Sequence, residues 1–133
     1  MNAVVDTNVV AYFLLGTEPY AEECRAFWRR SRQVWAPASW QAEIVSVLWM
    51  AFRTKVISAD ESARRLRLAA GLGIHSVPIR HIWRGALMRS IDSGISTYDS
   101  LFVELACRRH LPLVTFDRQL LRTYPSVAKH PSA

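Results

Sequence analysis

Four acidic residues of this chain occupy positions where an ionised carboxylate is costly to bury. Asp6 and Asp117 each follow a short apolar run, Glu43 lies in a tryptophan-rich segment, and Asp99 follows Ser96-Thr97-Tyr98. An unpaired buried carboxylate costs several kcal/mol, and two of them about 4 Å apart repel by about 4 kcal/mol at an effective dielectric constant of about 20. A divalent cation relieves both penalties, so the pattern predicts a metal site.

The available ligands indicate which cation this site would bind. The four histidines, His75, His81, His110 and His130, have no spacing that is typical of a zinc site, and the two cysteines are far apart. A site with only oxygen ligands favours Mg²⁺ or Mn²⁺ over zinc.

The charge of the chain favours a polyanionic partner. Its formal net charge is +6 and its pI is near 10.0, and nearly all of its basic residues are arginines. Guanidinium groups bind phosphate oxygens in a bidentate manner or stack on bases. A divalent cation that is bound by carboxylates on a basic protein suits phosphodiester hydrolysis, in which the metal activates water. The alternative for any single arginine is compositional bias on a solvated helix face.

Size and hydropathy predict one compact domain over residues 1–133. Half of the 133 residues are hydrophobic, which allows a real core. No apolar run approaches the roughly 20 residues that span a bilayer, and the N-terminus does not resemble a signal peptide. We therefore expect a soluble cytoplasmic protein, with Cys24 and Cys107 as free thiols.

Strand and helix signals alternate along the chain, which is typical of a parallel sheet covered by helices. The predicted strands are 2–5, 33–36, 74–77 and 113–116. The predicted helices are 6–16, 19–32, 38–52, 58–71, 79–90, 96–110 and a last one from 117. Pro19 suits the first turn of the second helix.

This arrangement indicates how the four acids could meet. Asp6 and Asp117 each follow a strand directly, and ligands of parallel sheets gather at the carboxyl ends of the strands. Glu43 is one helical turn from Trp40 and from Val47, on an apolar stripe. For Asp6 and Asp117 the alternative is helix capping, worth about 1 kcal/mol. For Asp99 it is a favourable interaction with the helix dipole.

Three other acids are explained by ordinary helix chemistry. Asp60 and Glu61 belong to a capping box that begins at Ser58. Glu104 is spaced for an exposed ion pair with Arg108, so we assign it to the surface.

The motifs together resemble a known family. Val5-Asp6-Thr7-Asn8, an acid in the third helix, Ser96-Thr97-Tyr98-Asp99 and Leu113-Val114-Thr115-Phe116-Asp117 occur in the order found in PIN-domain nucleases of the VapC toxin type. The resemblance covers nearly the whole chain. Residues 53–81 carry no recognisable family motif.

The resemblance implies a three-layer α/β/α fold with a mainly parallel sheet and Mg²⁺- or Mn²⁺-dependent cleavage of RNA. By matching position, Asp6 and Asp99 would bind the metal directly, and Glu43 and Asp117 directly or through water. Small polar side chains would orient these acids, namely Thr7, Asn8 and Thr115. The resemblance further implies neutralisation by a VapB-type antitoxin, whose C-terminal segment presents a basic side chain to the acidic groove, and a homodimer. From their position after Asp117 we expect Arg118 and Arg122 to contact substrate phosphates.

Other functions fit less of the sequence. An aspartyl phosphatase would need an acid two residues after its nucleophile, and Asn8 is there instead. A receiver domain would need a lysine after a late strand, which neither Lys55 nor Lys129 provides. A housekeeping RNA-processing nuclease and a PIN-fold binding module without catalysis remain as alternatives.

Overall fold

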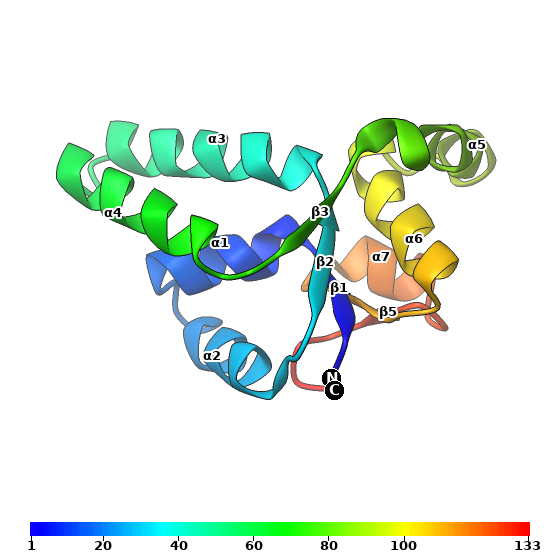
Figure 1. Cartoon of the computed structure of the whole chain (residues 1–133), viewed down its shortest axis with the longest axis horizontal. Helices are drawn as coiled ribbons and strands as arrows, with labels where there is room; N and C mark the ends of the chain where they lie inside the picture. Colours follow the sequence, from blue (N-terminus) through cyan, green and yellow to red (C-terminus); the bar gives the residue numbers. More distant parts are fainter.

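A five-stranded parallel sheet forms the centre of the computed structural model, which describes residues 1–133 (Figure 1). Its strand order is β3-β2-β1-β4-β5, and every neighbouring pair is parallel. The strands are β1 (Ala3–Val5), β2 (Val34–Pro37), β3 (His75–Val77), β4 (Leu113–Val114) and β5 (Ala128–Lys129). Val5 pairs with Val114, so the segments that leave β1 and β4 begin next to each other.

Helices cover both faces of this sheet, which confirms the expected three-layer α/β/α fold. The first four helices lie on one side and the last three on the other (Figure 1). They are α1 (Thr7–Leu15), α2 (Ala21–Arg30), α3 (Ser39–Arg53), α4 (Ala59–Ala70), α5 (Trp83–Ser93), α6 (Thr97–Arg109) and α7 (Arg118–Thr123). A short 3₁₀ helix, η1 (Ile79–His81), precedes α5. None of the helices is both long and apolar enough to cross a bilayer.

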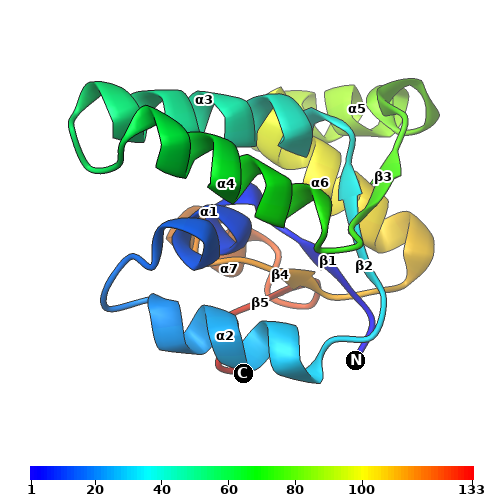
Figure 2. The same cartoon turned by 60° about the vertical axis from the view of Figure 1, so that its left-hand side comes forward.

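The hydrophobic core explains why the central strands are apolar without interruption. Ala3, Val4 and Val5 are fully buried, because helices pack on both faces of β1. They belong to a cluster of 30 buried residues that also takes in α1 and α6. Helices α3 and α4 lie side by side and extend beyond the sheet (Figure 2).

Local signals set several helix ends as the sequence predicts. The Ser58 hydroxyl accepts a hydrogen bond from the Glu61 amide at 3.1 Å, and the Ser96 hydroxyl accepts one from the Asp99 amide at 3.2 Å. Gly16 ends α1 in the left-handed conformation with φ of 62°, which glycine adopts at little cost. Cys24 and Cys107 are free, as expected.

Some predicted boundaries are wrong. Strand β4 ends at Val114 rather than at residue 116, and β5 was not predicted, because two residues on a sheet edge show no alternation. The predicted helix 79–90 is instead η1 followed by α5, since Ile82 leaves the helical conformation with φ of −131°. Pro19 lies in a turn before α2, not within its first turn.

The assignment of Glu104 to the surface is also wrong. Its side chain does pair with Arg108, at 2.6 Å, but also with Arg89 on α5, at 2.9 Å, and the residue is only 8% exposed. Helix spacing identified the pair with Arg108 but could not reveal that α5 covers this face of α6. Gly85 makes the close approach possible, because a Cβ there would overlap the Glu104 carboxyl group.

The Glu104 ion pairs should stabilise the fold in a pH-dependent way. Burial alone would raise the pKa of Glu104, but hydrogen bonds from Arg108 and Arg89 outweigh it and hold the pKa below its usual value of 4.5. A depressed folded-state pKa stabilises the fold above the unfolded-state pKa, and this contribution is lost as the pH falls through the folded-state pKa.

We therefore predict that Glu104→Gln lowers the free energy of unfolding by about 2 kcal/mol at pH 7. The difference from wild type should disappear as the pH falls below 4.5. Urea unfolding across a pH series measures it. Glu61→Gln, which breaks a more exposed pair with Arg65, is the matched control and should cost less than about 0.5 kcal/mol. Equal effects of the two substitutions would contradict the role assigned to Glu104.

Candidate active site

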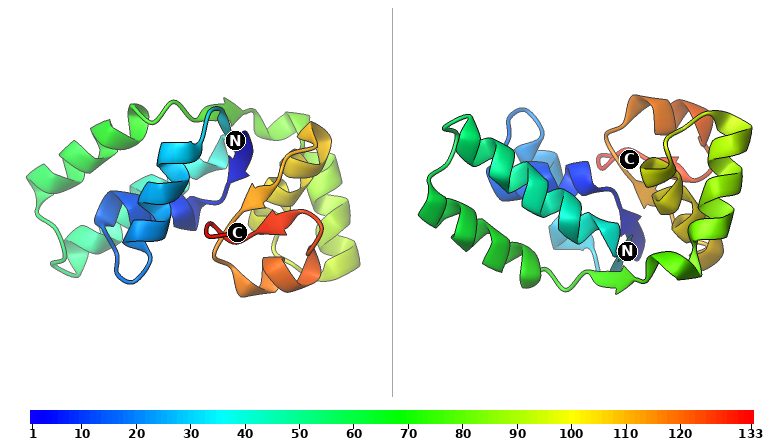
Figure 3. Two further views of the ribbon diagram at one scale, coloured as in Figure 1. Left: turned by 90° about the horizontal axis from the view of Figure 1, so that it is seen from below. Right: turned by 90° about the horizontal axis from the view of Figure 1, so that it is seen from above.

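The structure brings the four acids of the sequence analysis into one cavity of about 380 Å³. Asp6 and Asp117 come from the segments before α1 and α7, Glu43 from α3 and Asp99 from the first turn of α6. The elements that carry them converge at the edge where the parallel strands end. The right-hand view of Figure 3 shows the ribbon from this side. Asp60 and Glu61 do not line this cavity.

Asp6 is the most enclosed of the four, with 6% of its surface exposed. Its Oδ1 accepts a hydrogen bond from the Thr7 amide at 2.8 Å, so it caps α1 as the structural alternative predicts. Its Oδ2 accepts hydrogen bonds from the Thr115 hydroxyl at 2.7 Å and the Asn8 side-chain amide at 3.4 Å. Asp6 therefore caps α1 and also belongs to the acidic site.

Thr115 connects Asp6 to the segment that carries Asp117. Its hydroxyl donates to Asp6 and accepts hydrogen bonds from the Asp117 amide at 2.9 Å and the Asn8 side chain at 3.4 Å. Asp117 in turn accepts a hydrogen bond from the Leu120 amide at 3.0 Å and so caps α7. The network fixes the segments after β1 and β4 relative to each other.

Glu43 on α3 is held by the residue that follows Asp6. The Thr7 hydroxyl donates a hydrogen bond to its Oε1 at 3.2 Å. Glu43 and Asp99 are both half-buried, on helices from different layers of the fold. Thr7 thus contacts two of the acids, Asp6 through its amide and Glu43 through its hydroxyl.

Electrostatics make this cavity unfavourable for four negative charges. The pKa of Asp6 is raised to about 7, mainly by burial and also by the nearby Asp99 and Glu43, against the lowering effect of the hydrogen bonds from Thr115 and Thr7. Burial also raises the pKa of Glu43 and of Asp99, and the neighbouring Asp117 raises that of Asp99 further. No arginine, lysine or histidine lines the cavity to offset these charges. Perturbed carboxyl groups in one cleft are typical of functional sites.

The donor set fits a hard divalent cation, although no three carboxylates lie close enough together to hold one ion jointly. Mg²⁺ keeps several waters and takes only one or two protein carboxylates directly. Two direct ligands with further carboxylates acting through water are compatible with that chemistry. The buried Asp6 carboxyl group, whose pKa is raised, is the group with most to gain from a cation.

No pattern in the sequence predicted that Thr17 belongs to the site. Thr17 lines the cavity because the left-handed turn at Gly16 reverses the chain, with the Thr17 amide bonded to the Tyr12 carbonyl at 3.1 Å. Arg118 and Arg122 are exposed on α7 and do not line the cavity.

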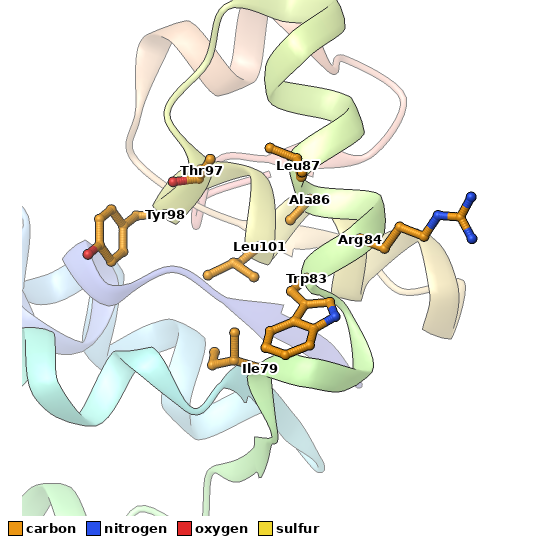
Figure 4. Close-up of a pocket in the computed structure, with 8 residues that line it drawn as sticks. All are labelled: Ile79, Trp83, Arg84, Ala86, Leu87, Thr97, Tyr98 and Leu101. Carbon is orange, nitrogen blue, oxygen red and sulfur yellow. The ribbon is translucent and has the colours of Figure 1, made fainter.

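A second cavity, of about 640 Å³, lies beside the acidic one and is mainly apolar. Figure 4 shows Trp83 and Leu87 of α5 and Tyr98 and Leu101 of α6 along its walls. Tyr98 is adjacent in sequence to Asp99, so the two cavities are neighbours on α6. This one has no carboxylate and therefore offers nothing to a cation.

Comparisons with known proteins match almost the full length of the chain. The PIN domain family matches residues 3–124. Ribonuclease VapC3 from Pyrobaculum aerophilum is 24% identical over 131 residues, which cover 96% of this chain and 98% of that protein.

Two solved structures share the fold. One is a toxin-antitoxin complex from Klebsiella pneumoniae, with a TM-score of 0.70 and 18% identity over 97% of each chain. The other is VapBC2 from Rickettsia felis bound to a DNA fragment from its promoter, with a TM-score of 0.67 and 13% identity over 98% of each chain. The chain is thus distantly related to VapC ribonuclease toxins.

The burial of Asp6 predicts a stability gain on neutralising it. The folded-state pKa of Asp6, about 7, exceeds its usual value of 3.8. The contribution of Asp6 to the free energy of unfolding is therefore fully present below pH 3.8 and is lost as the pH rises through 7. In the presence of a chelator at pH 8, Asp6→Asn should therefore be more stable than wild type by roughly 2 kcal/mol, and the gap should close near pH 4. Thermal and urea unfolding measure both values.

Asp60→Asn, at an exposed helix start, is the control and should change stability little at either pH. A loss of stability in Asp6→Asn at pH 8 would show that the carboxylate is not under electrostatic strain.

Proposed function

Because this chain belongs to the PIN domain family, we propose that it is a metal-dependent endoribonuclease that acts as the toxin of a VapBC-type toxin-antitoxin pair. The observation that carries the proposal is the convergence of four carboxylates on one cavity, without any basic residue among its walls. The chain is otherwise strongly basic, with a net charge of +6.

Asp6 and Asp99 would hold Mg²⁺ or Mn²⁺ directly, and Glu43 and Asp117 would contribute through water, because no three carboxylates lie close enough together to hold one ion jointly. When bound, such an ion supplies an activated water and neutralises charge that develops on the phosphoryl oxygens. Thr7, Asn8 and Thr115 act as positioning residues. The Thr115 hydroxyl fixes Oδ2 of Asp6 at 2.7 Å, and the Thr7 hydroxyl fixes Oε1 of Glu43 at 3.2 Å.

The charge distribution supports this division of roles. Four acids without a cation repel an RNA phosphate, so the cavity accepts substrate only when its charge is offset. Seventeen basic residues against eleven acidic ones attract RNA over longer distances. Arg118 follows Asp117 directly and Arg122 lies one helical turn further along α7, and both are exposed, which suits contacts with phosphates near the cavity.

A VapB-type antitoxin is the partner that we propose for the acidic cavity. Two structural neighbours are a toxin-antitoxin complex and a VapBC2 structure. A lysine or arginine of the antitoxin would neutralise the carboxylates as a cation does and would exclude substrate. Induced expression without the antitoxin would then arrest growth, whereas a housekeeping nuclease would not.

We further propose a homodimer through α5. This helix exposes four large apolar side chains, Trp83, Leu87, Met88 and Ile91. Arg84 and Asp92 lie four residues on either side of Met88, so two antiparallel copies centred there would place each arginine opposite an aspartate. An exposed apolar face with self-complementary charges is typical of a two-fold interface.

The acidic site predicts a loss of chemistry without a loss of binding. Asp6→Asn and Asp99→Asn should each lower metal-dependent RNA cleavage by on the order of 100-fold or more, because each removes a charged metal ligand. RNA affinity in chelator should be unchanged or tighter, since each variant removes a negative charge. Cleavage of labelled RNA and anisotropy measure the two quantities.

Asp60→Asn is the matched control and should cleave like wild type. Equal metal-dependent cleavage by wild type and both site variants would refute the nuclease site. RNA binding without any cleavage by wild type would favour the non-catalytic binding module.

The α5 interface predicts a charge-swap rescue. Arg84→Asp and Asp92→Arg should each shift the protein towards the monomer, because each places like charges opposite one another. The double variant should restore the dimer. Light scattering coupled to size exclusion measures the mass. Met50→Glu on the exposed face of α3 is the control and should leave the dimer intact. A monomeric wild type, or a double variant that is no more dimeric than the singles, would contradict this interface.

A further inference from the structure

A third cavity, of about 480 Å³, lies on the α6 side of the sheet and is lined partly by basic and amide side chains. Its polar residues are Asn2 and Gln33 before β1 and β2, His81 of η1, and Arg108 and Arg109 at the end of α6. No acidic residue lines it, and it shares no lining residue with the acidic cavity.

Arg109 is the distinctive group of this cavity. Its guanidinium carbon lies 3.4 Å from the centre of the Trp35 ring, so the guanidinium group stacks on the indole. Trp35 is itself packed against His75 on the neighbouring strand, with ring centres 4.5 Å apart. The stack fixes the plane of the Arg109 guanidinium group before any ligand binds.

Arg109 has no anionic partner, whereas its neighbour Arg108 pairs with Glu104. Arg89 and Arg108 pair with Glu104, and Arg25 and Arg29 pair with Glu22. The Arg109 side chain makes neither an ion pair nor a hydrogen bond within the chain, although it is exposed and oriented by Trp35. A favourable interaction with the C-terminal end of α6 accounts for its charge, but not for its stacking on Trp35.

A planar guanidinium group with free donors matches the geometry of a phosphate, which it binds through two parallel hydrogen bonds. Arg108 adds a second positive charge, because Glu104 is already shared between two arginines. The cavity therefore attracts anions and offers nothing to a cation.

We propose that this cavity is a second contact site for RNA, where Arg109 binds a backbone phosphate of a single strand away from the bond that is cleaved. The inference rests on the proposed nuclease function. Asn2 and Asp6 are at opposite ends of β1, about 13 Å apart at the rise of an extended strand. A strand that reaches both sites is held at two points, so Arg109 would contribute to affinity and to the register of cleavage but not to the chemical step.

The test is the affinity of a labelled single-stranded RNA, measured by anisotropy over a salt series in chelator. Arg109→Ala should weaken binding by roughly 10-fold and lower the slope of log Kd against log salt by about 1. Arg109→Lys keeps the charge but loses the planar donors, so it should keep the slope and still weaken binding severalfold. Arg64→Ala on α4 removes an exposed arginine that lines neither cavity and should leave the affinity nearly unchanged.

Two competitors identify the source of the phosphate. Inorganic phosphate and a mononucleotide, added at constant ionic strength, should not displace the RNA at concentrations where an unlabelled single strand does. Displacement by either, or by an acidic peptide as effectively as by RNA, would overturn the proposal in favour of a small anion or a protein partner. Equal losses of RNA affinity in Arg109→Ala and Arg64→Ala would show that only the net charge of the protein matters. That result would also overturn the proposal.

The outcome is separable from that of the proposed function. Binding is measured without metal, so an inactive wild type that still loses RNA affinity through Arg109→Ala would refute the nuclease and keep this site. A cleavage assay at saturating RNA should show that Arg109→Ala retains the wild-type rate. A rate loss at saturation would contradict a role confined to binding.

Discussion

The structure depends on one electrostatic constraint, which is the burial of the Asp6 carboxyl group where β1 and β4 end. Its position follows from parallel pairing, because Val5 and Val114 are partners and the segments after them must lie together. Hydrogen bonds from Thr7, Asn8 and Thr115 hold the carboxyl group in place. They do not cancel the cost of its burial beside Glu43 and Asp99, as the raised pKa of Asp6 shows. The folded protein thus retains a carboxylate whose burial is unfavourable, and a bound cation would offset that cost. Such a loss of stability is common where a buried group serves a function.

The charge of the acidic cavity is opposite to that of the chain as a whole. The acidic cavity has no basic wall, while the chain as a whole is basic. In the proposed function, RNA attracted to the surface would meet a local barrier at the carboxylates, and either a metal ion or an antitoxin cation would offset their charge, with opposite results for the substrate. A metal ion would admit the phosphate, whereas a side chain of a bound partner would occupy its place. The RNA contact that we propose at Arg109 shares no lining residue with the acidic cavity, so it would not depend on a bound metal ion.

The sequence predicted the features that local chemistry determines. Strand-end acids, caps at Ser58 and Ser96, and the central apolar strands were all visible in residue types and spacing. Features that depend on packing between distant elements were not. Glu104 looked exposed because its partner Arg89 is on another helix, and no residue spacing indicated that Arg109 lies over the ring of Trp35 from β2. Strand β5, with two residues on a sheet edge, has too little pattern to be predicted.

We propose that the four carboxylates form a metal-dependent site for RNA cleavage. The most direct measurement is to incubate purified protein with cellular RNA, with Mg²⁺ or with a chelator, and to sequence the 5′ ends that appear. The proposed nuclease site predicts a small set of new 5′ ends that form with Mg²⁺ and are absent in chelator. New ends that form equally in chelator, or none under either condition, would contradict it.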